Sequence, residues 1–347
     1  MPLATPLLFK GAPGSPYTRK MLALLRYRHI RYRFMVSGAP ALAALPVPKV
    51  ELLPTFYLPD ASGQLVAVTD SSPLLRRFEA EFAGRAVRPS DALLAFVDSL
   101  LEDYADEWLT KAMFHYRWHY AADIAKAGNI VPRWRNLTAS DEKIAQLDRA
   151  FSQRQINRLY VVGSNEKTWM TIEDSYRRFL AAFDAHLSRH AFLLGSRPGA
   201  SDFGVHGQLT QLAHFDPTPA ALTLAVAPRV YAWVDLVDDL SGLDPTDEGW
   251  ITRDDMASSL APLLQEMART YVPVMLANAR ALASGQGTVE TTVDGVTWAQ
   301  QAFPYQGKCL RWLREEFAAL LPDERAAADQ LLLHNGCADL IHARIGA

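Results

Sequence analysis

The fold of this chain is decided near its start, by the stretch LLFKGAPGSPYTRKMLALLRY at positions 7–27. The apolar run Leu7–Lys10 stops at the breaker cluster Gly11–Gly14, so we expect a short strand that ends in a turn. From Pro16 onward apolar residues recur at a spacing close to 3.6, which predicts a helix. Ser15 stands where a hydroxyl caps the first turn, and proline suits the first helical position.

The residues that follow continue this alternation of strands and helices. Residues 30–36 alternate between apolar and polar side chains, which is typical of a half-buried strand. After a proline-rich, irregular segment, residues 52–58 and 65–68 flank a turn and predict a hairpin. Asp70-Ser-Ser-Pro73 then opens a helix over 74–82. The predicted order is strand, helix, strand, irregular segment, two strands and a helix.

From about residue 85 the chain is mostly helical, and 347 residues are enough for two domains. We therefore predict an α/β domain over 1–84 and an all-α domain over 85–347, with a polar excursion at 126–168. Residues 289–298 hold two β-prone runs around Asp294-Gly295, a strong hairpin signal. Candidate helices are 90–124, 169–190, 201–214, 230–240, 255–283, 305–321 and 323–334.

The composition is that of an ordinary globular chain, with 49% hydrophobic and 21% charged residues. A net charge of −3 gives no broad electrostatic basis for binding nucleic acid or an anionic membrane. No apolar run approaches the ~20 residues of a membrane-spanning helix. Met1–Lys10 has no basic region ahead of its apolar stretch, so no secretory signal is expected. Cys309 and Cys337 form no CxxC pair, which favours structural thiols in a cytosolic chain.

This order of elements resembles that of the cytosolic glutathione transferases, whose N-terminal domain is thioredoxin-like. The family more often has Glu where this chain has Asp70, and a Ser or Thr where Gly199 precedes Asp202 by three residues, so a capping hydroxyl is missing here. Four segments carry the resemblance: residues 14–21 at the start of the first helix, 52–56 around the family's cis-proline, 69–72 with its acidic-Ser pair, and 196–203 at the start of its buried sixth helix.

The resemblance implies glutathione as a co-substrate. The segment with Leu53 and a cis Pro54 would dock the cysteinyl backbone like an added strand. Asp70 would meet the α-ammonium group of the γ-glutamyl end, and Ser71, at a helix N-terminus, its α-carboxylate. The alternative is that Pro54 is trans in a loop and that Asp70 and Ser71 only cap the next helix.

Ser15 occupies the place of the family's activating serine or cysteine, so it is the favoured residue for stabilising the glutathione thiolate. Tyr17 is the rival donor, because some transferases use a tyrosine from this region. Both also have simpler interpretations. Ser15 can be a helix cap without chemistry, and Tyr17 a packing residue on the first turn.

An acidic cluster is the most unusual sequence of the helical half. Glu102 and Asp106 share a helix face at i,i+4, and Asp103 and Glu107 repeat this pattern, which is repulsive unless a cation meets them. We expect Arg117 and arginines of neighbouring helices to neutralise these carboxylates at the domain or dimer interface.

The aromatic residues around this cluster have two interpretations. The corresponding family helix lines the second-substrate pocket, and the alternative is ordinary packing. His115 and His119 have a spacing that permits metal ligation, but no second histidine pair or Glu-x-x-His unit accompanies them, so no metal is expected. The candidate pocket residues are Tyr104, Trp108, His115 and Trp118.

The favoured function is a cytoplasmic, homodimeric glutathione transferase that conjugates the glutathione thiolate to an electrophile. A first alternative is another glutathione-dependent enzyme on the same fold, an isomerase, dehalogenase or reductase. Serine at position 15 disfavours disulfide exchange, because a hydroxyl cannot form a mixed disulfide. A second alternative is a non-enzymatic binding or assembly protein, which the large helical additions favour.

Overall fold

The computed structural model describes residues 3–346. Its first part is a four-stranded sheet in the order β2-β1-β3-β4, in which β1 runs parallel to β2 and antiparallel to β3. The predicted order of elements is confirmed. These are β1 (Leu7–Gly11), α1 (Pro16–Tyr27), β2 (Tyr32–Val36), the 3-10 helix η1 (Pro40–Ala44), β3 (Thr55–Pro59), β4 (Leu65–Thr69) and α2 (Ser71–Glu81).

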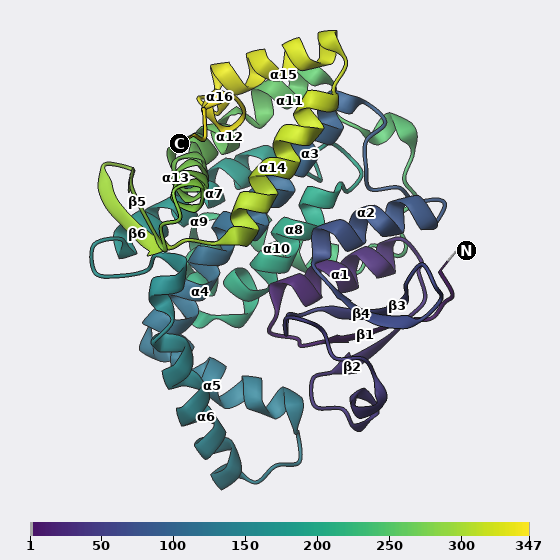
Figure 1. The fold of residues 1–347 in the computed structure, drawn as a ribbon, viewed down its shortest axis with the longest axis vertical. Coiled ribbons are helices and arrows are strands. Elements are labelled where there is room, and N and C mark those ends of the chain that lie inside the picture. Colours follow the sequence, from purple (N-terminus) through teal and green to yellow (C-terminus); the bar gives the residue numbers. More distant parts are fainter. Residues whose placement is uncertain (1–2, 347) are drawn as a thin grey trace.

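One face of this sheet is buried beneath α1 and α2 (Figure 1). The rings of Phe9 in β1 and Phe56 in β3 stack 4.6 Å apart, and Phe78 of α2 meets Phe56 edge-on at 5.3 Å. Helix α1 buries the apolar residues whose spacing predicted it, among them Met21 and Leu25. The alternation of apolar residues in the strands and their 3.6 spacing in α1 thus converge on one core.

The rest of the chain is almost entirely helical, as predicted. Its helices are α3 (Ala92–Tyr104), the π-helical η2 (Ala105–Leu109), α4 (Thr110–His119), α5 (Ala121–Arg135), α6 (Asp141–Ile156), η3 (Leu159–Val162), α7 (Trp169–Leu187), α8 (Ala200–Leu209), η4 (Thr210–Phe215), α9 (Pro217–Val226), α10 (Pro228–Asp238), η5 (Asp247–Gly249), α11 (Arg253–Ser259), α12 (Ala261–Arg269), α13 (Tyr271–Ala283), α14 (Pro304–Ala319), α15 (Pro322–His334) and α16 (Ala338–His342).

Two segments project from the helical bundle (Figure 1). Helices α5 and α6 pack against each other and extend away from it. Strands β5 (Thr288–Val293) and β6 (Val296–Gln301) form an antiparallel hairpin. Its turn residues Asp294 and Gly295 both have positive φ, the geometry for which the Asp-Gly pair is suited.

Within residues 3–346 no single helix is long and apolar enough to cross a membrane. Helices α9 and α10 meet that criterion only as a pair, and a bend of 115° separates them.

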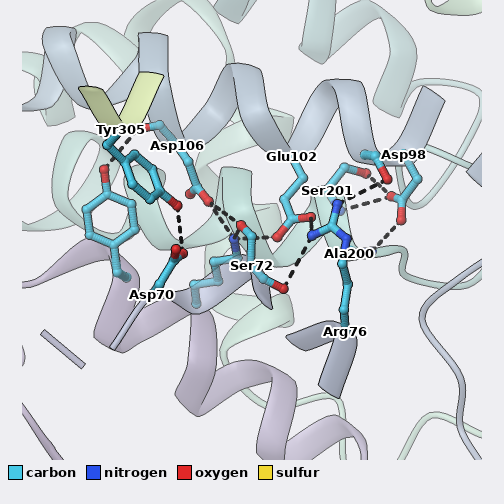
Figure 2. Close-up of polar contacts among 12 residues, drawn as sticks. Asp70, Ser72, Arg76, Asp98, Glu102, Asp106, Ala200, Ser201 and Tyr305 are labelled. Atoms are coloured by element: carbon cyan, nitrogen blue, oxygen red, sulfur yellow. Dashed lines mark hydrogen bonds and ion pairs between the residues drawn. The ribbon is translucent and has the colours of Figure 1, made fainter. Parts of the chain in front are cut away.

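Helix α8 starts without a capping hydroxyl, as the sequence predicted. The N–H of Gly199 donates to Asp202 Oδ2 at 2.8 Å. Asp98 of α3 supplies the missing acceptor. Its carboxylate accepts from the N–H groups of Ala200 (3.0 Å) and Ser201 (2.9 Å) and from the Ser201 hydroxyl (2.6 Å), as Figure 2 shows. A Cβ at position 199 would lie 2.4 Å from Asp98 Oδ1, so glycine leaves room for this carboxylate.

The two parts of the molecule meet along several helices. Helix α1 packs on α8, where a Cβ at Gly207 would lie 2.4 Å from the carbonyl oxygen of Pro16. The late helices α14 and α15 return to pack on α3, and Glu316 of α14 pairs with Arg76 of α2 at 3.2 Å. Of the C-terminal additions, α14 therefore contacts the α/β domain, whereas α15 and α16 lie at the far end of the molecule (Figure 1).

Candidate active site

The sheet register gathers the predicted glutathione-binding residues at one edge. Lys10 near the end of β1 pairs with Thr55 at the start of β3, and Thr55 pairs with Thr69 at the end of β4. The segments that leave this edge are the loop before α1, the residue Pro54, and the pair Asp70-Ser71. Residues distant in sequence therefore lie around one end of the sheet.

Ser15 caps α1, as predicted. Its Oγ accepts a hydrogen bond from the N–H of Thr18 at 3.3 Å, and Pro16 follows at the first helical position. A hydroxyl that accepts through a lone pair keeps its own proton to donate. Capping and donation to a thiolate are therefore compatible in one side chain.

The loop before α1 is held by the helical part of the molecule. Arg117 of α4 donates to the carbonyl oxygen of Gly14 at 3.0 Å and is itself fixed by Asp216 at 2.8 Å and Gln211 at 2.7 Å. The expectation that Arg117 neutralises the acidic cluster is wrong. Its guanidinium is committed to Asp216, which binds it through both carboxylate oxygens.

The Leu53-Pro54 peptide bond is cis, as predicted. Within the described residues, neither the N–H nor the carbonyl group of Leu53 has a hydrogen-bond partner. Both groups can thus pair with the backbone of an extended peptide.

Asp70 and Ser71 lie where β4 ends and α2 begins. Asp70 holds the N-cap position of α2 with a φ of 87°, and its carboxylate makes no side-chain capping hydrogen bond there. Ser71 is the first residue of α2 and is 6% exposed. The first N–H groups of a helix have no intrahelical partner, so this end can receive an anion.

Tyr305 of α14, which the sequence analysis placed in a helix but did not assign to the site, meets Asp70. Its hydroxyl donates to Asp70 Oδ1 at 2.6 Å (Figure 2). Burial raises the pKa of Asp70, and the Tyr305 hydrogen bond and the charges of Lys308 and Lys20 partly offset this. Since 235 residues separate Tyr305 from Asp70, no local sequence signal could have paired them.

Comparison with known proteins identifies the domain that carries this geometry. Residues 9–86 match the family described as "Glutathione S-transferase, N-terminal domain". This part of the chain is a glutathione S-transferase-like domain. The match spans Ser15, Pro54, Asp70 and Ser71, and the helices of the remaining chain follow this domain.

Solved structures with similarity to this chain have low sequence identity to it. A GST-like protein from Pseudomonas syringae has 18% identity and a TM-score of 0.41, covering 67% of this chain and 66% of that one. A glutathione S-transferase from Methylobacterium radiotolerans, in complex with glutathione sulfonate, has 16% identity and a TM-score of 0.39, covering 73% and 93%. A glutathione transferase family member from Pseudomonas fluorescens, with bound glutathione, has 19% identity and a TM-score of 0.38, covering 69% and 100%. No curated protein matches the chain.

A buried ionic network joins the glutathione transferase-like domain to the helical domain (Figure 2). Lys20 of α1 lies 2.6 Å from Glu102 Oε1 and 2.5 Å from Asp106 Oδ2, and Arg76 of α2 lies 3.4 Å from Glu102 Oε2. Burial raises the pKa of Glu102, but Lys20 and Arg76 outweigh burial and hold that pKa at about 2. Cations do meet the i,i+4 carboxylates at the domain interface. Arg76 of α2 confirms the expected arginine from a neighbouring helix, whereas Lys20 was not predicted.

The second acidic pair, Asp103 and Glu107, is poorly compensated. Asp103 accepts a hydrogen bond from the Tyr271 hydroxyl, and burial raises the pKa of Asp103 to about 7. Burial and the charge of Asp103 raise the pKa of Glu107 to about 8. Cys309 of α14 lies beside them as a buried free thiol, and burial together with these carboxylates raises its pKa strongly. Asp103, Glu107 and Cys309 therefore form a buried cluster whose two carboxyl groups can bind protons near neutral pH.

Tyr17 is packed at the domain interface. Its hydroxyl donates to the main-chain carbonyl of Asp106 at 2.8 Å, and burial, with the charges of Glu107 and Asp106, raises its pKa well above the usual value. The proton that Tyr17 could offer to a thiolate is thus already engaged.

The four candidate residues of the second-substrate pocket lie in the core, as the packing alternative expected. Trp108 donates to the Ser175 hydroxyl at 2.7 Å. His115 makes hydrogen bonds to Ser164 at 2.8 Å and Glu173 at 3.3 Å, and its ring stacks on His119 at 4.8 Å. Exposure is 2% for Tyr104, 3% for Trp108, 0% for His115 and 3% for Trp118. In the described part of the chain, no group of three or more His, Cys, Asp or Glu could hold a metal ion.

Proposed function

We propose that this chain binds glutathione at the edge of its sheet and transfers the glutathione thiolate to an electrophile. The observation that carries the proposal is the family match over residues 9–86, within which Ser15, Pro54, Asp70 and Ser71 surround one end of the sheet. The free backbone groups of Leu53 would pair with the cysteinyl residue, and Asp70 and Ser71 would hold the γ-glutamyl end.

Ser15 would stabilise the thiolate without a general base. A free thiol has a pKa of about 8.5, and lowering it by about two units requires roughly 2.7 kcal/mol of preferential thiolate stabilisation. A hydrogen bond from a hydroxyl to an anion contributes ~1.5–3 kcal/mol. The N-terminus of α1 adds about 0.3–1 kcal/mol. Together these two contributions amount to roughly 1.8–4 kcal/mol, a range that includes the required value.

Asp70→Asn and Ser71→Ala test the binding site. Each should weaken glutathione binding by about 1–3 kcal/mol, because each removes a hydrogen bond to a charged group. Isothermal titration calorimetry measures the affinity, and the exposed Lys143→Met variant serves as a control. Wild-type affinity in both variants would show that the γ-glutamyl end lies elsewhere.

Retention on immobilised glutathione, together with a thiol-conjugation assay over a range of electrophiles, tests the function itself. Retention with conjugation supports a transferase. Retention without conjugation points to another reaction on this fold, isomerisation, dehalogenation or reduction, or to a binding protein. The binding-protein alternative has one observation in its favour, because Tyr305 already engages Asp70. Absence of retention would contradict the proposal.

We also propose a cytoplasmic homodimer. The assembly is what the family resemblance implies. The location is supported by the two cysteines, both of which are buried free thiols.

A further inference from the structure

We infer that the added helix α14 completes the site for the γ-glutamyl end, with Lys308 binding its α-carboxylate and Tyr305 positioning Asp70 for its α-ammonium group. This inference rests on the proposed function. It assigns part of ligand recognition to a segment that lies outside the glutathione S-transferase-like domain.

Asp70 keeps acceptor positions beside its hydrogen bond with Tyr305. The Tyr305 hydroxyl donates to Oδ1 of this carboxylate at 2.6 Å, and the backbone N–H of Ser72 also acts on the carboxylate and lowers its pKa. A carboxylate offers about four acceptor positions, so the Tyr305 hydrogen bond leaves room for an ammonium group. Tyr305 is 37% exposed, which leaves this junction open to solvent.

Lys308 of α14 supplies a cation beside this junction. Lys308 follows Tyr305 by one turn of α14, is half-buried, and lies over the ring of Trp312 at 4.3 Å and that of Tyr305 at 5.9 Å. Its charge acts on Asp70, yet among the described residues no carboxylate lies within 4.0 Å of its ammonium group. Aromatic rings hold such a cation in place without neutralising it.

The proposed ligand carries charges of both signs at this end. The γ-glutamyl end of glutathione is a zwitterionic α-amino acid, with one ammonium and one carboxylate on the same carbon. The Asp70 carboxylate can still accept from a ligand cation. Lys308 and the N-terminus of α2 at Ser71 can each bind an anion. The two signs of charge are thus held near each other without forming an ion pair, which is the pattern that a zwitterion matches.

The test compares glutathione with two analogues, one lacking the α-carboxylate and one lacking the α-amino group. Lys308→Met should weaken glutathione binding about 10-fold, the effect of losing a hydrogen bond to a charged group, and leave the affinity for the analogue without the α-carboxylate unchanged. Lys308→Arg, which keeps the positive charge, should still bind glutathione more tightly than the analogue without the α-carboxylate. Lys143→Met, an exposed lysine of α6, is the matched control.

Tyr305→Phe tests the positioning role. It should weaken glutathione several-fold but spare the analogue without the α-amino group, because the hydroxyl acts through Asp70. A purely structural role would weaken both ligands alike. Tyr160→Phe is its control, because the Tyr160 side chain is 58% exposed.

The outcomes separate the two proposals. Wild-type binding of glutathione with no selective effect of Lys308→Met and Tyr305→Phe overturns the inference and leaves the proposed function standing. Equal losses for all ligands overturn it as well. If the wild type binds no glutathione, both fail.

Discussion

At the scale of single residues, Ser15 links the start of a helix to the proposed chemistry. We expect Ser15→Ala to slow conjugation by roughly 10–100-fold and to raise the pKa of the bound thiol, while glutathione affinity changes little. The reason is that the hydroxyl proton, free while Oγ accepts from Thr18, stabilises the thiolate but not the thiol. Stopped-flow conjugation rates as a function of pH measure both effects.

Tyr17→Phe is the matched comparison, and it should have a much smaller effect because its hydroxyl already donates to the carbonyl of Asp106. Ser15→Ala also removes a helix cap, at a cost of about 1 kcal/mol, so urea unfolding must show that the variant is folded under assay conditions. A silent Ser15→Ala beside a crippling Tyr17→Phe would reverse the two roles.

Lys20 contributes to the pH dependence of stability through its pairing with Glu102. The folded pKa of Glu102, about 2, lies below its ordinary value, so its pairing stabilises the fold above about pH 4.3 and is lost as the pH falls through 2. Lys20→Met should lower the free energy of unfolding by about 3–5 kcal/mol at pH 7, because Asp106 stays buried without its cation and Glu102 keeps only Arg76 at 3.4 Å.

This loss should shrink at about pH 3.5, where the unpaired carboxylates of the variant bind protons and need no cation. Urea unfolding of both proteins at the two pH values gives the comparison, with Lys143→Met as an exposed control. An equal loss at both pH values would mean that the side-chain volume of Lys20, and not its charge, is what matters.

Sequence could show that Glu102 and Asp106 need a cation, because their i,i+4 spacing places two charges on one helix face. It could not show which cation. Lys20 lies 82 residues away in the other domain, and Arg117, which is closer in sequence, is bound to Asp216 instead.

At the scale of elements, a double-mutant cycle can test whether Gly199 and Asp98 act together at the start of α8. Gly199→Ser alone should destabilise the protein by about 1–3 kcal/mol, because its Cβ would lie 2.4 Å from Asp98 Oδ1. Asp98→Ala alone removes three hydrogen bonds at the start of α8 and should be destabilising by a similar amount or more.

Combined, the two changes should cost less than their sum. Asp98→Ala makes room for the new side chain, and the serine introduced by Gly199→Ser would supply the capping hydroxyl itself. Urea unfolding of the four proteins gives the coupling energy. Strict additivity would show that Gly199 and Asp98 do not compensate for one another.

Helices and strands were predicted correctly where the sequence pattern is local. They were predicted wrongly at prolines, because a proline can either end a helix or occupy the first turn of the next one. The strands of the first domain and α1 follow directly from their alternation and spacing. The predicted helix 255–283 is three helices in the structure, with Pro262 and Pro273 in the first turns of α12 and α13. Helix α9 was missed because Pro217 and Pro219, which begin it, look like breakers in the sequence.

At the scale of the whole molecule, the return of α14 to the α/β domain is what sequence could not predict. Helical periodicity identifies α14 as an amphipathic helix but says nothing about its partner. Its contacts with the α/β domain rest on single side chains, Tyr305 with Asp70 and Glu316 with Arg76, each far apart in sequence. The fold class could be read from local patterns, whereas the composition of the site depends on these long-range contacts.

The proposed homodimer is the prediction that belongs to this scale. Light scattering at micromolar concentration should give about twice 38.5 kDa, and the value should fall on dilution as the dimer dissociates. Helices α14 and α15 already pack on α3, and Glu316 pairs with Arg76, so the dimer must use surface that these helices leave free. A mass of 38.5 kDa at every concentration would contradict the proposal. It would imply that the added helices supply within one chain the cover that a partner subunit would otherwise give to α3.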